Sequence, residues 1–69
     1  MIPISKIKVG DIFRYPGVSN GVYFIVKEID LKEKCILLQG YSSSYLCDKA
    51  ASPFWKKNTD SIFSEEGRV

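Results

Sequence analysis

Two cysteines are the most reactive side chains of this 69-residue sequence, which contains no histidine. Histidine is both the commonest general base near neutral pH and the commonest metal ligand, so its absence weighs against acid–base catalysis and metal binding together. Two cysteines alone cannot supply the four Cys or His ligands of a structural zinc site within one chain. We therefore expect no metal and no cofactor.

Cys47, which lies beside Asp48 and Lys49, is the best remaining candidate for a nucleophile. A neighbouring carboxylate raises the pKa of a thiol and lowers its thiolate fraction, although Lys49 offsets part of that effect. The sequence also lacks the Gly-x-Ser-x-Gly elbow of acyl transfer and the glycine-rich loop of nucleotide hydrolysis. We predict a non-enzyme in which Cys35 and Cys47 are free buried thiols, with a disulfide as the alternative.

Two sets of side chains are candidates for binding a macromolecule. The first is a polar and aromatic set of the kind found on adaptable protein-binding surfaces, and it comprises Tyr41, Ser43, Tyr45, Arg14 and Tyr15. The second joins a ring that can stack on a base to lysines that can contact phosphate: Lys49, Trp55, Lys56 and Lys57. The structural alternative for the tyrosines is a strand with one solvent-exposed face. The structural alternative for Trp55 is a cap on the core, with the lysines exposed to solvent at the rim of the barrel.

The composition is that of a globular protein, with 45% hydrophobic and 26% charged residues. Ten lysines and arginines are scattered among eight acidic residues, giving a net charge of +2, which is weak support for nucleic-acid binding. This length favours a single domain, residues 1–69, with a small core. We expect that core to need the larger rings: Phe13, Phe24, Phe54, Trp55 and Phe63.

Runs of β-branched and aromatic residues between turn formers predict an antiparallel meander. The predicted strands are residues 11–15, 22–29, 35–39, 41–47 and 59–64. A hairpin loop is expected at 16–21, a charged turn at 30–34 and a kink at Gly40. The second half of strand 22–29 is polar, which predicts a bend or bulge there.

The remaining segments are expected to close the two ends of the molecule. Ile4, Ile7 and Val9 are available to cover one end of the core. Ser52 can cap, and Pro53 can begin, one helical turn that ends at Asn58. Residues 65–69 are predicted to form a frayed tail.

This layout resembles the SH3-like small barrels, a group that includes KOW-type modules and short bacterial and phage proteins. The residues that carry the resemblance are Lys8 to Phe13, the loop rich in Pro, Gly and Asn, the hairpin from Phe24 to Leu38, and the turn from Ser52 to Asn58. The resemblance implies an all-β fold, a small barrel of about five antiparallel strands with one short helical turn. The acidic first loop and the proline-recognising aromatic cluster of the peptide-binding members are missing, so proline-rich peptides are not the implied ligand.

We expect a non-catalytic binding module that docks a macromolecule, a protein rather than a nucleic acid, through an exposed barrel face or strand edge. The alternatives are a nucleic-acid-binding small barrel and a structural or self-assembling subunit, either a monomer or a homodimer. The longest apolar run, Val22 to Val26, is far shorter than the ~20 residues of a membrane-spanning helix. The segment from Met1 to Lys6 has no signal-peptide pattern, so no membrane partner and a cytoplasmic location are expected.

Overall fold

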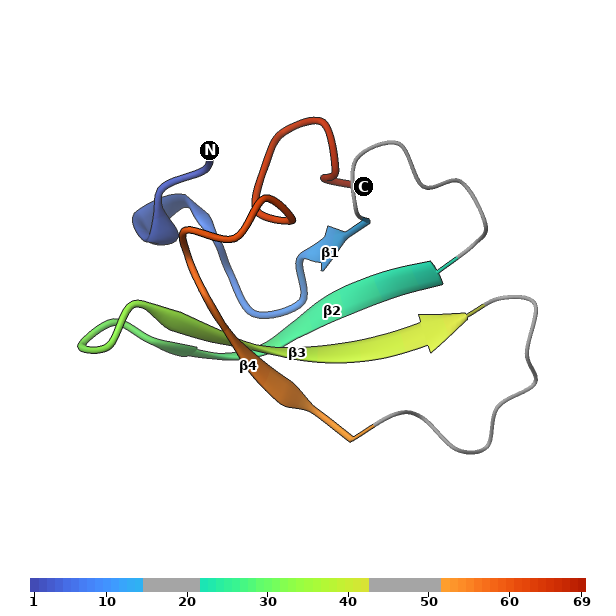
Figure 1. Ribbon diagram of the computed structural model, residues 1–69, viewed down its shortest axis with the longest axis horizontal. Helices are drawn as coiled ribbons and strands as arrows, with labels where there is room; N and C mark the ends of the chain where they lie inside the picture. The colour runs from blue at the N-terminus through green and yellow to red at the C-terminus, as the bar shows by residue number, and fades with distance from the viewer. Residues whose placement is uncertain (15–21, 43–51) are drawn as a thin grey trace.

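The fold is built on an antiparallel sheet (Figure 1). The computed structural model describes residues 1–14, 22–42 and 52–69, without the side chains of residues 41 and 42. These residues form a four-stranded sheet in the order β1-β2-β3-β4. Its elements are a 3-10 helix, η1, and the four strands: η1 at Ile4–Lys6, β1 at Ile12–Phe13, β2 at Val22–Asp30, β3 at Cys35–Ser42 and β4 at Phe54–Lys57. The all-β prediction is therefore confirmed.

β2 and β3 form the long central hairpin, and a charged turn joins them as predicted. The Asp30 carboxylate accepts the backbone N–H groups of Lys32 at 3.0 Å and Glu33 at 3.2 Å, so one side chain organises the turn. Lys34 completes it in the left-handed region, with φ of 55°. The turn is therefore organised mainly by contacts between residues close in the sequence.

The predicted irregularity in the second half of β2 is a bulge at Lys27. Val26 pairs with Leu38 and Glu28 pairs with Leu37, so two steps along β2 match one step along β3. A bulge of this kind bends a strand and increases its twist. β3 continues through Gly40, which pairs with Phe24.

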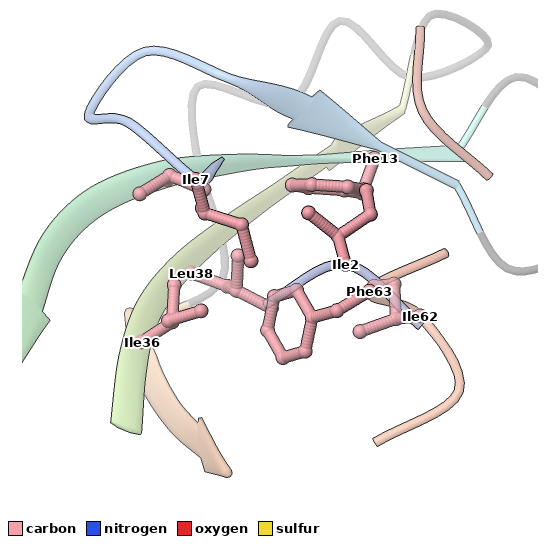
Figure 2. Packing of buried hydrophobic residues seen from close by; sticks show 8 residues of the cluster. Ile2, Ile7, Phe13, Ile36, Leu38, Ile62 and Phe63 are labelled. Carbon is pink, nitrogen blue, oxygen red and sulfur yellow. The ribbon is translucent and has the colours of Figure 1, made fainter. Parts of the chain in front are cut away.

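Eight buried apolar side chains fill the space between the sheet and the two terminal segments (Figure 2): Ile2, Ile7, Phe13, Val26, Ile36, Leu38, Ile62 and Phe63. The rings of Phe13 and Phe63 meet edge to face with their centroids 5.5 Å apart. The terminal segments also bind each other, because the Ile2 N–H donates to the Phe63 carbonyl at 2.9 Å and the Asn58 amide donates to the Ile2 carbonyl at 3.1 Å. Both segments lie on the same side of the sheet and cover its inner face (Figure 1).

Two residues expected in the core lie outside it. Val9 is 65% exposed and Trp55 is 49% exposed, whereas Phe24 and Phe54 pack against the core as expected. Trp55 follows Phe54 in a strand, and successive side chains of a strand point to opposite faces. Because Phe54 faces the core, Trp55 must face away from it.

The helical turn predicted at Ser52 to Asn58 is wrong, because Phe54–Lys57 is strand β4. β4 pairs with β3 over four residues, with Phe54 opposite Leu38 and Lys57 opposite Cys35. These ladder bonds outweigh the local capping signals of the sequence. The described part of the chain has its short helical turn at η1 instead. None of its helices is long and apolar enough to cross a membrane.

The last strand predicted at residues 59–64 is also wrong, because this segment is a series of tight turns. Ile62 and Phe63 are adjacent and both fully buried, which a strand with one face in water cannot achieve because it sends neighbours to opposite faces. Asp60 organises the turns. Its carboxylate accepts the Ile62 N–H at 3.0 Å, and its carbonyl accepts the Phe63 N–H at 3.1 Å.

The frayed tail predicted at residues 65–69 is instead docked along the free edge of β1. The Arg14 N–H donates to the Gly67 carbonyl at 2.7 Å, and the Val69 N–H donates to the Ile12 carbonyl at 2.9 Å. Arg68 forms an isolated antiparallel bridge with Phe13. These bonds satisfy the edge groups of β1, which explains why the C-terminal segment is ordered.

The described strands otherwise differ from the predictions in their limits. β1 is confined to Ile12–Phe13, and residues 41 and 42 belong to β3 rather than to a new strand. The rest of the strand predicted at 41–47 and the loop predicted at 16–21 lie outside the described residues. The same is true of Cys47, whereas Cys35 is a free, half-buried thiol.

Candidate functional site

The candidate site is the face of the sheet that turns away from the core. Phe13, Val26 and Leu38 point inward, so the residues one step away from them along each strand point outward. The register continues this alternation across the sheet, and the bulge at Lys27 shifts it within β2 so that Glu28 and Asp30 also point outward. We call this surface the outer face and define it by its described side chains: Ile12, Arg14, Tyr23, Ile25, Glu28, Asp30, Cys35, Leu37, Gln39, Trp55 and Lys57.

The middle of the outer face is apolar. Ile12 of β1 lies opposite Ile25 of β2, and Leu37 of β3 lies opposite Trp55 of β4. The two isoleucines and Leu37 are half-buried, and about half of the Trp55 surface is exposed. An antiparallel sheet with one face on the core normally presents a polar second face. Apolar side chains gathered on that second face are typical of a contact surface.

Charged groups of both signs surround this apolar middle. Glu28 lies opposite Leu37, and Lys57 lies opposite Cys35, at the end of the face nearest the charged turn. At the other end, the Arg14 guanidinium lies 5.8 Å from the centre of the Tyr23 ring, within the range of a cation–π contact. The outer face therefore has a mixed polar rim rather than a continuous basic patch.

The structure places part of the predicted protein-binding set on this face. Arg14 is half-buried there, and its backbone is fixed by the bond to Gly67. The backbone of Tyr41 lies in β3, where Tyr41 is the Cα partner of Tyr23. The other three members of the set lie outside the described residues: Tyr15, Ser43 and Tyr45.

The predicted nucleic-acid set is divided between the two faces of β4. Trp55 and Lys57 lie on the outer face, whereas Lys56 lies on the opposite face with Phe54. The Lys56 ammonium is 3.1 Å from the Asp60 carboxylate, so an acidic neighbour already compensates its charge. Lys49 lies outside the described residues. Adjacent lysines in a strand cannot serve one surface, because their side chains alternate.

Asp60 has a structural role in the turns after β4. The N–H of Ile62 lowers the pKa of the Asp60 carboxyl below its ordinary value of 3.8. Partial burial opposes this effect, and the Lys56 ammonium adds to it through a hydrogen bond and charge attraction. The ionised carboxylate thus holds the turn that buries Ile62 and Phe63, and it lies away from the outer face.

Groups suited to catalysis are sparse in the described part of the chain. Cys35 is half-buried, and its thiol lies 3.5 Å from the Glu33 carbonyl, which is a contact within the turn. Residues 1–14, 22–42 and 52–69 contain no group of three or more His, Cys, Asp or Glu side chains that could hold a metal ion.

Several members of the outer face were not singled out from the sequence, among them Tyr23, Ile25 and Leu37. These three lie in apolar runs that predict core strands, and a run that is apolar on both faces does not show which side meets the core. The alternation of Ile25 with Val26 and of Leu37 with Leu38 is compatible with either assignment. The register with β1 and β4 decides it.

Comparison with known protein families, curated proteins and solved structures finds no match to this chain. Its function is therefore inferred from its own residues and their geometry.

Proposed function

We propose that the chain is an SH3-like small barrel that acts as a non-catalytic module and docks another protein on its outer face around Trp55. The docking of the C-terminal segment on β1 supports the barrel, because the Phe13–Arg68 bridge gives that segment the place of a fifth strand. The order of elements, with tight turns between β4 and this segment, also fits the resemblance. The proposed barrel is open between the C-terminal segment and β4, because the outer edge of β4 pairs with no described strand.

The observation that carries the docking role is the exposure of Trp55 beside Leu37. Tryptophan is among the residues most enriched at binding hot spots, and truncating a hot-spot side chain costs about 2 kcal/mol or more of binding free energy. Because Trp55 points away from the core, core packing does not require a ring of this size at that position. A partner that covers Trp55 and Leu37 would bury their apolar area and leave the charged rim in water.

The mixed charge of the rim favours a protein over a nucleic acid as the partner. Nucleic acid binding draws most of its free energy from cations that contact phosphates. Glu28 and Asp30 lie on the outer face with Lys57, and Lys56 is turned to the other face beside Asp60. A phosphate backbone on this face would meet carboxylates as well as ammonium groups.

The proposal is tested by affinity capture with three immobilised proteins: wild type, Trp55→Ser and Leu31→Ser. Leu31 is the matched control, because it is an apolar side chain with 67% exposure that lies in the hairpin turn rather than on the outer face. We expect Leu31→Ser to retain the proteins that wild type captures and Trp55→Ser to lose them, with affinity reduced by ~30-fold.

Nuclease treatment of the lysate separates the two kinds of partner. Capture that survives nuclease and depends on Trp55 supports the docking role. Capture that is abolished by nuclease, or binding to an oligonucleotide that falls steeply with salt, would favour the nucleic-acid alternative. Equal capture by wild type and Trp55→Ser would show that the outer face is not the docking surface.

A further inference from the structure

The outer edge of β4 is the feature that points to a second role for this strand. β4 ends the sheet order, so within the described residues no strand pairs with its outer edge (Figure 1). The Asn58 N–H donates to the Lys34 carbonyl at 2.9 Å, so Asn58 and Lys34 occupy a hydrogen-bonded position of the ladder between β3 and β4. Bonded and non-bonded positions alternate along an antiparallel ladder. Trp55 and Lys57 therefore turn their backbone N–H and C=O groups away from β3.

At the opposite edge of the sheet the C-terminal segment covers β1, where it accepts the Arg14 N–H and donates the Val69 N–H. On β4, the Lys57 carbonyl already accepts the Asp60 N–H at 3.0 Å, so that position offers only its N–H. The same alternation turns the carbonyl of Pro53 outward, and proline has no N–H. The edge thus offers donors at Trp55 and Lys57 and acceptors at Trp55 and Pro53.

We propose that two copies of this chain pair antiparallel along β4, with Trp55 of one copy directly opposite Trp55 of the other. In this register each Trp55 N–H donates to the opposite Trp55 carbonyl, and each Lys57 N–H donates to the opposite Pro53 carbonyl. Pro53, which has no N–H, lies opposite the Lys57 carbonyl, which already accepts the Asp60 N–H. The donors at Trp55 and Lys57 and the acceptors at Trp55 and Pro53 then all have partners, because the edge of one copy presents an acceptor wherever the other presents a donor.

The other two-fold registers leave groups unpaired. A register centred on Lys57 aims its N–H at an occupied carbonyl, and one centred on Pro53 has no donor at its centre. A register centred on Lys56 sends the Trp55 N–H to the occupied Lys57 carbonyl and sets two lysines opposite each other, which is destabilising. A register centred on Phe54 leaves the Trp55 carbonyl without a donor.

Side chains also favour the register centred on Trp55. It places Lys56 opposite Phe54 and Lys57 opposite Pro53, so like charges do not face each other. The two Trp55 rings become direct cross-strand neighbours on the outer face, an arrangement that stabilises paired strands. Proline and lysine on an edge strand commonly discourage open-ended pairing. Here they restrict it to one closed, two-fold contact that joins the two sheets and their outer faces.

Sedimentation of the purified wild-type chain over a wide concentration range tests the dimer directly. We expect the dimer fraction to increase with concentration. Lys57→Pro should raise the dissociation constant of the dimer by about tenfold or more, because it removes two of the inter-copy donors while the bonds to β3 remain. Lys57→Ala keeps the N–H and should leave the dimer intact. A wild type that stays monomeric at millimolar concentration, or equal effects of the two variants, would overturn the proposal.

Disulfide cross-linking tests the register, in a chain with Cys35→Ser and Cys47→Ser. Directly opposed Cα atoms lie ~5.5 Å apart, within disulfide range, so Trp55→Cys should cross-link two copies on oxidation. Lys57→Cys is an equally accessible control. In the proposed register its two copies lie roughly 13 Å apart and should remain monomeric. Equal cross-linking of both variants, or of neither, would refute the register.

These measurements use the purified chain without any other protein. Failure of the dimer therefore leaves the docking proposal standing, and failure of affinity capture leaves the dimer standing.

Discussion

Replacing Gly67 with alanine should detach the C-terminal segment from β1. Gly67 is buried, and a Cβ atom added to it would overlap the backbone carbonyl oxygen of Arg14. A backbone oxygen within a strand edge cannot move aside as the end of a flexible side chain can. The added methyl group must therefore push the C-terminal segment outward.

The magnitude follows from the contacts that hold this segment. Two backbone hydrogen bonds, from Arg14 to Gly67 and from Val69 to Ile12, contribute about 1 kcal/mol each. The Arg68 guanidinium lies 2.9 Å from an Asp11 oxygen, and since both side chains are partly exposed this ion pair adds about 0 to 1 kcal/mol. Gly67→Ala should therefore destabilise the fold by about 2 to 3 kcal/mol. A chain of this length has a total stability of only about 3 to 10 kcal/mol.

Urea unfolding followed by the fluorescence of Trp55, the only tryptophan, measures this loss. Glu66→Ala is the matched control, because Glu66 is an exposed neighbour and its substitution should change stability by less than about 0.5 kcal/mol. In a chain that lacks Arg68 and Val69, Gly67→Ala should cost only about 1 kcal/mol, because the bond from Val69 to Ile12 and the ion pair of Arg68 with Asp11 are already absent. An unchanged unfolding curve for Gly67→Ala, or the same cost in the shortened chain, would refute the reasoning.

The other predictions concern the turns after β4 and the core. Since bonds from Ile62 and Lys56 lower the pKa of Asp60, its carboxylate stabilises the fold above the ordinary pKa of 3.8, and this contribution is lost as pH falls through the lower folded value. Asp60→Asn should lower the free energy of unfolding by about 1 to 2 kcal/mol at neutral pH, and it should weaken the loss of stability with falling pH that urea unfolding measures. Wild-type and Asp60→Asn profiles of stability against pH that stay parallel would contradict this. Phe63→Ala should cost about 3 to 5 kcal/mol and Trp55→Ala only about 1 kcal/mol in the same assay; equal costs would place Trp55 in the core.

The central hairpin could be predicted because its signals are local. The apolar run of β2, the charged turn at Asp30 and the polar end of β2 each depend on neighbours in the sequence. The turn and the bulge follow from them. β4 could not be predicted in the same way, because Ser52, Pro53 and Asn58 favour a helical turn locally. Pairing with β3 decided the outcome.

The candidate site was only partly predictable for a related reason. Arg14, Trp55 and Lys57 were recognised from their residue types, but as members of two separate sites. The strand register places them on one face and turns Lys56 to the other. Register depends on which residues of distant strands pair, and residue types do not encode it directly.

The sequence by itself determined the β-rich composition, the absence of histidine, and the hairpin whose turn is organised by its own side chains. Only the tertiary structure decided that residues 62 and 63 are buried by a turn, that the C-terminal segment pairs with β1, and that Trp55 faces outward. The physical reason is the range of the interactions. A turn forms from contacts a few residues apart, whereas a core and a sheet edge are completed by segments more than fifty residues away along the chain, as in the bond from Asn58 to Ile2.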